Sequence, residues 1–256
     1  MSVDAIAGQL LEAYRTREPV EQLTARYPEL TLEDAYAIQL AQVAYWTAEG
    51  AEIKGHKVGL TSAAMQEMLG IDQPDYGHLR DDMLHRDGDA IPAEQFIAPR
   101  AEPELGFVLK ERLAGPGVTL QDAAQAVGSV APALELIDSR IRDWKIGLLD
   151  TIADNASSGA FVLGAVAAAD NLDLPGIRCS LSLNGEVVET GNGAAVLGNP
   201  LAAVAWLANT LAERGIALEA GHVVLPGACT RAVPFAAGDN VEASFDGLGT
   251  VTARFV

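Results

Sequence analysis

The sequence predicts an α+β fold in which helices come first and a mostly β body follows. Over residues 1–50 apolar side chains recur at helical spacing. From about residue 97 they recur with a period of two, in short runs separated by Gly, Asn, Asp and Pro. Because helices and strands are segregated along the chain, the pattern is typical of α+β proteins.

Two amphipathic helices are expected in the N-terminal part. The first has apolar residues at positions 6, 10, 13 and 14 and stops before Pro19. The second begins with a capping box of Thr31 and Asp34 and ends at Gly50. Its apolar stripe is expected to be Leu32, Tyr36, Leu40, Val43 and Trp46. We expect residues 1–60 to form a helical cap or oligomer surface that leads into the first core strand.

Residues 61–256 are expected to form the catalytic body, as one continuous domain with the cap. The strand-like runs are IAPRAEPELGFVL, SVAPALELI, GAFVLGAV, RCSLSLNGEVVETG, HVVLPGA and NVEASFDGLGTVTARFV. Asn184-Gly185 and Asp246-Gly247 predict hairpin turns within them. One helix interrupts the runs, with Asn199 as N-cap, Pro200 in its first turn and Gly215 beyond its end. Trp206 and Asn209 on that helix are interpreted as structural.

Composition limits the possible partners. The chain has 256 residues, of which 35 are acidic and 17 basic, so its formal charge is -18. This charge argues against nucleic-acid and membrane partners and favours metal cations. Two distant cysteines predict neither a disulfide framework nor a zinc site, and we expect no signal peptide or membrane span. A reducing cytoplasm fits these features.

Three glutamates are the candidate metal ligands. On a strand, Glu102 and Glu104 point to the same face, roughly 6.5–7 Å apart. Such a pair alone most often marks a solvated face. Glu135, however, lies in the apolar run APALELID, where burial of an unpaired carboxylate would cost several kcal/mol. Since a hard divalent cation offsets such clustered charge, the three predict an open magnesium or manganese site with room for a bidentate substrate.

A second group of polar residues is the candidate acid–base and substrate site. Lys57 precedes Gly59, and Thr61 and Ser62 precede a short helical pattern, which places the ammonium at a strand end beside a helix N-terminus. Read alone, Lys57 is more often a surface lysine. Asp75, in QPDYG, is more often a turn residue.

The segment DTIADNASSG offers hydroxyl and amide groups that could line a pocket, from Asn155, Ser157 and Ser158. Its alternative interpretation is a helix end and a turn. None of the four histidines has metal-binding spacing, and no G-x-G-x-x-G, P-loop or G-x-S-x-G motif is present. Nucleotide-dependent and serine-hydrolase functions are therefore disfavoured.

Six segments together resemble one family: GHKVGLTSAAMQ, QPDYGHL, PRAEPELGFVL, PALELIDSRIRDW, DTIADNASSG and GNGAAVLGNPLAAVAWLANTL. In this order they are similar to the 2-oxopent-4-enoate hydratase and 4-oxalocrotonate decarboxylase family, within the fumarylacetoacetate hydrolase superfamily. The resemblance implies a mixed β-roll with N-terminal helices, a divalent metal and homo-oligomers. It also implies that Glu102, Glu104 and Glu135 bind the metal and that Lys57 is catalytic. Pro103, between two of the glutamates, departs from the family pattern.

The resemblance further implies hydration of a 2-hydroxy-2,4-dienoate to a 4-hydroxy-2-oxo acid, in the degradation of aromatic rings by meta-cleavage. Asp75 would position or deprotonate the water, and its carboxylate favours hydration over decarboxylation by analogy with the family. A 4-oxalocrotonate-type decarboxylase and a catalytically silent metal-binding scaffold, associated with a neighbouring pathway enzyme, remain alternatives. Whether the substrate is a five-carbon dienoate or a seven-carbon diacid stays open.

Overall fold

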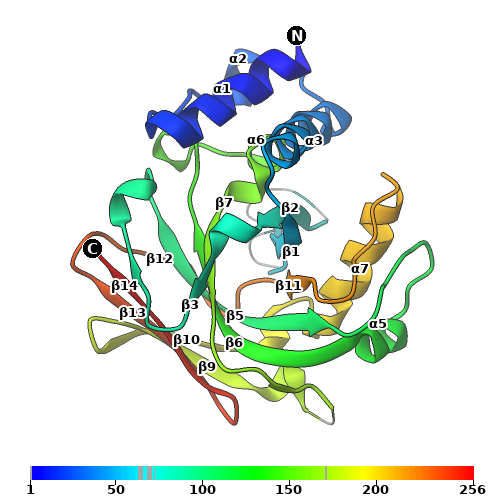
Figure 1. Ribbon diagram of the computed structural model, residues 1–256, viewed down its shortest axis with the longest axis vertical. Helices are drawn as coiled ribbons and strands as arrows, with labels where there is room; N and C mark the ends of the chain where they lie inside the picture. The colour runs from blue at the N-terminus through cyan, green and yellow to red at the C-terminus, as the bar shows by residue number, and fades with distance from the viewer. Residues whose placement is uncertain (1, 63–65, 68–70, 72, 171) are drawn as a thin grey trace.

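The computed structural model describes residues 2–62, 66–67, 71, 73–170 and 172–256. Figure 1 shows most of the N-terminal helices gathered at one end of a body built from two β-sheets. The α-helices are α1 (Val3–Thr16), α2 (Leu23–Arg26), α3 (Leu32–Ala48), α5 (Leu120–Ala126), α6 (Leu148–Ala153) and α7 (Pro200–Ala212).

The two predicted N-terminal helices are confirmed as α1 and α3, and the short helix α2 between them was not predicted. The capping box is confirmed, with the Thr31 side chain accepting from the Asp34 amide and the Asp34 carboxylate accepting from the Thr31 amide. Helix α1 ends at Thr16, and Arg17 follows it in the left-handed region at φ 63°. Helix α3 packs against α1 and α6.

The buried face of α3 differs from the predicted stripe. Leu32 is 36% exposed, whereas Gln39 and Gln42 are fully buried. The Gln39 side-chain amide donates to the carbonyl oxygens of Tyr76 and Ile152, and that of Gln42 donates to Ala153 O. The side-chain nitrogens of both glutamines are therefore satisfied by backbone carbonyls of a β-strand and of α6, while their side-chain oxygens are buried without a partner among the described residues.

Among the described residues, one sheet has nine strands and the other has five, and both are mixed. The strand order in the larger sheet is β2-β1-β11-β5-β6-β7-β3, with β12 paired to β5 and β8 to β6. Its strands are β1 (Ile53–Gly59), β2 (Asp75–Arg80), β3 (Leu84–Arg86), β5 (Arg100–Leu109), β6 (Val127–Ile137), β7 (Ser158–Leu163), β8 (Ala167–Ala168), β11 (Val223–Leu225) and β12 (Val233–Pro234).

The smaller sheet has the strand order β10-β9-β13-β14-β4. Its strands are β4 (Ala90–Ile91), β9 (Arg178–Leu183), β10 (Glu186–Asn192), β13 (Asn240–Phe245) and β14 (Gly249–Phe255). Asn184-Gly185 joins β9 to β10, and Asp246-Gly247 joins β13 to β14, so both predicted hairpins are confirmed. The fold is thus a mixture of helices and two mixed sheets. The finer description as a β-roll, and the division of the chain after residue 60, stay predictions.

Helix α7 forms as predicted, with the Asn199 side chain accepting from Leu201 N and Pro200 in the first turn. The segment Gly193–Ala212 has the length and hydropathy of a membrane span, but 44% of it is buried inside the fold. Its apolar face is therefore accounted for by the protein core. Trp206 packs against that core, and the Asn209 side chain pairs with both backbone groups of Val118.

Candidate metal and acid–base site

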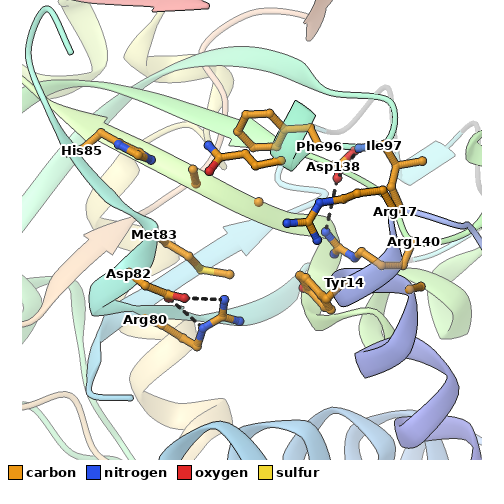
Figure 2. Close-up of a pocket in the computed structure, with 14 residues that line it drawn as sticks. Tyr14, Arg17, Arg80, Asp82, Met83, His85, Phe96, Ile97, Asp138 and Arg140 are labelled. Atoms are coloured by element: carbon orange, nitrogen blue, oxygen red, sulfur yellow. Dashed lines mark hydrogen bonds and ion pairs between the residues drawn. The ribbon is translucent and has the colours of Figure 1, made fainter. Parts of the chain in front are cut away.

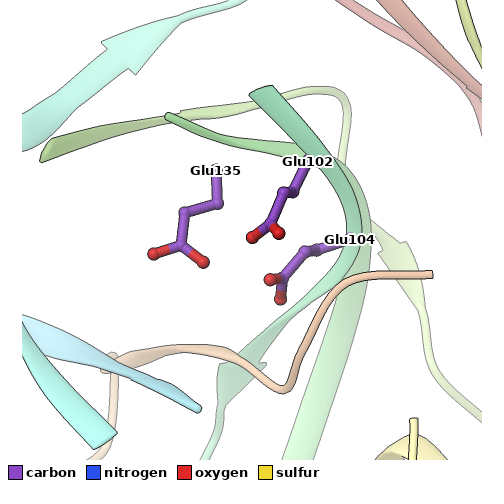
Figure 3. Close-up of side chains that lie close together, drawn as sticks. All are labelled: Glu102, Glu104 and Glu135. Carbon is purple, nitrogen blue, oxygen red and sulfur yellow. The ribbon is translucent and has the colours of Figure 1, made fainter. Parts of the chain in front are cut away.

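The register of two central strands brings the three glutamates together. In the antiparallel pair of β5 and β6, Glu102 lies directly opposite Glu135, and Glu104 follows two residues later on the same face. Each offers one carboxylate oxygen, and these oxygens all lie within 4.8 Å of one another. Figure 3 shows the three carboxylates converging on one space. Glu104 and Glu135 are buried, so the alternative of a solvated strand face is wrong for them.

Pro103 does not interrupt this arrangement. Its carbonyl oxygen accepts from Cys229 N at 2.9 Å, on the side of β5 away from β6. In a strand the N–H and C=O of one residue point to the same side, so the missing amide of a proline here removes no bond between β5 and β6. The pairing of Glu102 with Glu135 is therefore preserved.

The carboxylate cluster is not satisfied by the protein alone. Within the described part of the chain, Glu104 Oε1 and both Glu135 carboxylate oxygens are buried without a hydrogen-bond partner, while Glu104 Oε2 accepts from Gly227 N at 2.8 Å. Burial raises the pKa of all three, and repulsion from Glu135 adds to this effect for Glu104 and for Glu102, whose pKa rises to about 7. Unpartnered, convergent carboxylate oxygens are the donor set that a hard divalent cation prefers, so the residues present fit such an ion.

Lys57 lies beside this cluster rather than at the surface. It is only 4% exposed, and its Nζ lies 3.3 Å from Glu135 Oε1 and donates to Ala156 O at 3.0 Å. Burial disfavours the ammonium, but Glu135 and Asp75 more than offset that effect, so the pKa of Lys57 is raised. The interpretation of Lys57 as a surface lysine is wrong, and the side chain is charged at neutral pH.

Asp75 opens β2, so its interpretation as a turn residue is wrong. It is 1% exposed and pairs across the strands with Gly59. A Cβ placed on Gly59 would lie 2.2 Å from Asp75 Oδ1 and 3.4 Å from Lys57 Nζ. The absent side chain of Gly59 therefore makes room for both charged groups. Burial raises the pKa of Asp75, and its Oδ1 has no hydrogen-bond partner among the described residues.

A strained turn presents the carbonyl that accepts from Lys57. Asn155, Ala156 and Ser157 all have φ near +51°, a conformation that L-residues adopt only when the surroundings hold it. The Asn155 side chain holds the turn by accepting from His78 N at 2.8 Å and donating to His78 O at 2.9 Å. The Ser158 hydroxyl donates to Asn155 O at 2.8 Å. Asn155 and Ser158 are thus committed to the backbone and position the turn; their contact with a substrate stays a prediction.

An ion pair that sequence reasoning missed supports the same turn from behind. Arg140 Nε donates to Asp154 Oδ1 at 2.6 Å, and its Nη1 donates to Ser158 O at 2.9 Å. Both charged side chains are at most 1% exposed. The segments DSRIRDW and DTIADN showed charges between apolar residues, but no spacing rule pairs residues 140 and 154 before the fold is known.

Thr61 lies close to Gly227, whose amide donates to the carboxylate of Glu104. Gly227 has φ 130°, and a Cβ there would lie 2.2 Å from Thr61 Oγ1, so only glycine can bring its amide to Glu104. Sequence reasoning missed Gly227, although the Pro-Gly pair after HVVL was a visible signal. Ser62 is half-buried and its carbonyl accepts from Gln66 N. The helical pattern expected after it lies largely outside the described residues, and substrate contacts of Thr61 and Ser62 stay predictions.

The comparisons with known proteins agree with this geometry. The chain is 46% identical over 256 residues to a 2-hydroxyhexa-2,4-dienoate hydratase of Comamonas testosteroni, covering 99% of this chain and 97% of that protein. It is 45% identical to a 2-oxo-hept-4-ene-1,7-dioate hydratase of Escherichia coli, covering 98% and 97%. The solved 4-oxalocrotonate decarboxylase from Pseudomonas putida G7, complexed with magnesium and adipate, superposes with a TM-score of 0.96 at 41% identity, covering 99% and 97%.

The expectation of an enzyme of the hydratase and decarboxylase group is confirmed by these relatives. Residues 55–256 also match the fumarylacetoacetate (FAA) hydrolase C-terminal family, which is most of the chain. Strands β1 to β14, including those that carry the three glutamates, Lys57 and Asp75, lie almost wholly within the matched range. The chain therefore belongs to the FAA hydrolase C-terminal family.

Proposed function

We propose that the protein is a divalent-metal-dependent hydratase that adds water to a 2-hydroxy-2,4-dienoate and yields a 4-hydroxy-2-oxo acid. One observation carries the proposal. Three convergent carboxylates, of which those of Glu104 and Glu135 are buried and have unpartnered oxygens, lie next to a charged lysine and to the buried carboxylate of Asp75. Hydration of a conjugated 2-oxo acid requires three groups: a divalent metal ion, a cationic side chain and a base.

Glu102, Glu104 and Glu135 would hold a magnesium or manganese ion. When bound, that ion supplies positive charge to the carboxylate and the 2-oxygen of the substrate. The Gly227 amide fixes the orientation of Glu104, and Lys57 fixes that of Glu135. These contacts preorganise the ligand set, which tightens metal binding.

Lys57 would place its ammonium near the substrate's 2-oxygen. Its contacts with Glu135 and with the carbonyl of Ala156 leave one N–H available, and the charge is retained because the pKa is raised. An ammonium at this position stabilises negative charge on the 2-oxygen as the dienol becomes the ketone.

Asp75 would hold the water that adds to C4 and accept its proton. Its free Oδ1 can accept that hydrogen bond. Burial raises the pKa of Asp75 toward the range of an effective base. The 2-hydroxyl proton is transferred to C5 as the ketone forms, and the proton that the water loses is balanced by the one that C3 gains, so the reaction needs no further reactant.

Decarboxylation is the second candidate, favoured by the superposition with a 4-oxalocrotonate decarboxylase. Asp75 argues against it, because a carboxylate facing the substrate's departing carboxylate would repel it. A catalytically silent scaffold is the non-enzyme alternative.

The test offers 2-hydroxypenta-2,4-dienoate and 2-oxohex-3-enedioate side by side to the purified, magnesium-loaded protein. We expect the dienoate to be consumed to 4-hydroxy-2-oxopentanoate, with little carbon dioxide from the diacid. Fast carbon dioxide release with no loss of dienoate would identify a decarboxylase instead. The seven-carbon diene diacid, included as a third substrate, decides the chain length.

Lys57→Ala separates enzyme from scaffold. We expect it to abolish turnover while metal binding persists, because Lys57 contacts Glu135 but is not a ligand. Lys54→Ala is the matched control, since Lys54 lies on the same strand with an exposed side chain. If the unsubstituted, metal-loaded protein converts neither substrate, the result would support the scaffold.

We further propose that the protein works in the cytoplasm as a homo-oligomer, in association with a neighbouring enzyme of its pathway. Cys179 and Cys229 are both free and buried, which fits a reducing compartment. Light scattering on the purified protein measures the oligomer size.

A further inference from the structure

A second cavity, of about 110 Å³, lies between the end of α1 and the β7–β3 edge of the large sheet. It is separate from the glutamate cluster. Its polar lining comes from Tyr14 and Arg17 of the α1 end, Arg80 of β2, Gln95, and Asp138 and Arg140 beyond β6. We propose that this cavity is a binding site for the carboxylate group of a small aliphatic acid.

Two buried donors in the cavity have no partner. Among the described residues, Arg80 Nη1 and Gln95 Nε2 are inaccessible to solvent and make no hydrogen bond. Arg80 cannot turn away, because Asp82 accepts from its Nε at 2.9 Å and its Nη2 at 3.1 Å, and its guanidinium stacks 4.2 Å from the Trp46 ring. An unpaired buried donor costs about 1–3 kcal/mol, and an acceptor would remove that cost once a small shift of the lining opens these nitrogens to the cavity.

One cation beside the cavity is left without a carboxylate partner. Of the three guanidinium groups that line it, that of Arg80 is paired with Asp82 and that of Arg140 with Asp154, whereas Arg17 has no ion-pair partner among the described residues. The lining also holds the carboxylates of Asp82 and Asp138. Both carboxylates are already engaged, that of Asp82 by Arg80 and that of Asp138 by the amides of residues 97 and 98 at 3.0 and 2.7 Å. Since Arg17 is exposed, it supplies a cation at the mouth.

The other residues that line the cavity favour a ligand with a short apolar chain attached to its carboxylate. Figure 2 shows Arg17 and Arg140 at one end of the cavity and His85 at the other, with Met83 and Phe96 between them. Burial lowers the pKa of His85, so this end is neutral. A guanidinium pairs with a planar carboxylate through two parallel bonds, whereas apolar walls would leave some oxygens of a tetrahedral anion without donors. A short aliphatic carboxylate satisfies both ends.

The cavity lies directly behind the candidate active site. Arg140 and the Tyr14 hydroxyl both donate to Ser158 O, at 2.9 and 3.2 Å. Ser158 closes the left-handed turn whose Ala156 carbonyl accepts from Lys57. One short segment therefore separates the two sites.

The test is calorimetric titration of butanoate into the full-length protein, after its metal has been removed with EDTA so that the glutamate cluster does not compete. Butanamide, which has the same shape without the charge, and sulfate are titrated in parallel. We expect butanoate to bind at one site per chain and the other two not to bind. Arg17→Met and Gln95→Leu should each weaken butanoate by about tenfold, or about 1.4 kcal/mol.

The control is Arg15→Met, which removes the same charge from the same helix at an exposed position outside the cavity. It should leave butanoate affinity unchanged. Absence of butanoate binding, equal binding of butanamide or sulfate, or equal losses in Arg15→Met and Arg17→Met would each overturn the proposal. Because two cavity variants are measured, the proposal stays testable if one of them fails to fold.

Discussion

Two buried charged clusters flank the turn of Asn155–Ser158, and they differ in how completely their polar atoms are paired. On one side, Arg140 and Asp154 engage each other through one hydrogen bond between their side chains and two that involve a backbone atom. On the other side, Glu104, Glu135 and Asp75 keep carboxylate oxygens that accept no hydrogen bond from the described residues. Both clusters are buried to the same extent. Burial of charge alone therefore does not distinguish a structural pair from a functional site.

The difference lies in what each cluster needs in order to be stable. A saturated ion pair is complete within the chain, and removing one partner leaves an uncompensated charge. An unsaturated carboxylate cluster is stabilised by protons, by Lys57 or by an external cation. The Arg140–Asp154 pair holds the turn in its strained conformation. The carbonyl of Ala156 in that turn then positions Lys57 beside the carboxylate cluster.

The largest effect is expected from Glu104→Gln. Loss of one carboxylate from the unsaturated cluster should lower kcat/KM by about 100-fold to 1,000-fold, the size seen when one preorganised electrostatic group is removed. Metal affinity, measured by calorimetry, should fall with it. The metal-free variant should be at least as stable as the unsubstituted protein, because repulsion is relieved. Glu111→Gln, an exposed position just beyond β5, is the control.

Arg140→Met should chiefly reduce stability. Because Asp154 would be left buried without its partner, we expect the free energy of unfolding to fall by about 3–5 kcal/mol. Urea denaturation followed by circular dichroism measures the change. Arg142→Met provides the matched control, since Arg142 is 45% exposed and should cost about 1 kcal/mol or less. Equal losses in the two variants would contradict the comparison.

The pH dependence of stability should distinguish metal-free from metal-loaded protein. The pKa of Glu102 is raised to about 7 in the metal-free fold, above its unfolded value near 4.3. A raised carboxyl pKa stabilises the fold fully below the unfolded pKa, and this contribution is lost as pH rises through the folded pKa. Between pH 4.5 and 7.5, roughly, we expect the free energy of unfolding to fall by about 1–2 kcal/mol. Magnesium should flatten this slope, and a metal-independent slope would argue against the cluster as its site.

The smallest effect is expected from Trp206→Phe. Trp206 packs at the edge of the core on α7, away from both clusters. We expect a loss of about 1 kcal/mol in the free energy of unfolding, as is typical of a partly buried large-to-small change, with turnover unchanged. A fall in kcat without a change in stability would place α7 in the active site.

The sequence by itself determined the long helices α1, α3 and α7, most strands after residue 97 and which residue types could bind a metal, but not α2, α5, α6 or the strands β2 to β4. Capping residues, hairpin dipeptides and the two-residue period are local, so Thr31, Asn184-Gly185 and the E-x-E spacing could be interpreted without the fold. The apolar run around Glu135 indicated burial through the cost of an unpaired charge. Its position opposite Glu102 depended on strand register.

Only the tertiary structure decided which polar groups are paired and which are left free. Arg140 with Asp154, Gly227 with Glu104, and the two arginines of α1 and β2 that line one cavity are far apart in the chain. Similarly, Gln39 and Gln42 are not part of the apolar stripe predicted for α3, yet both are buried, with their side-chain nitrogens donating to carbonyls of distant segments. Which polar groups are paired depends on distances between segments that are far apart in the sequence, and no periodicity reveals these distances. Whether a buried charged group is fully paired and structural, or unpaired and free to bind a ligand, is therefore known only from the folded chain.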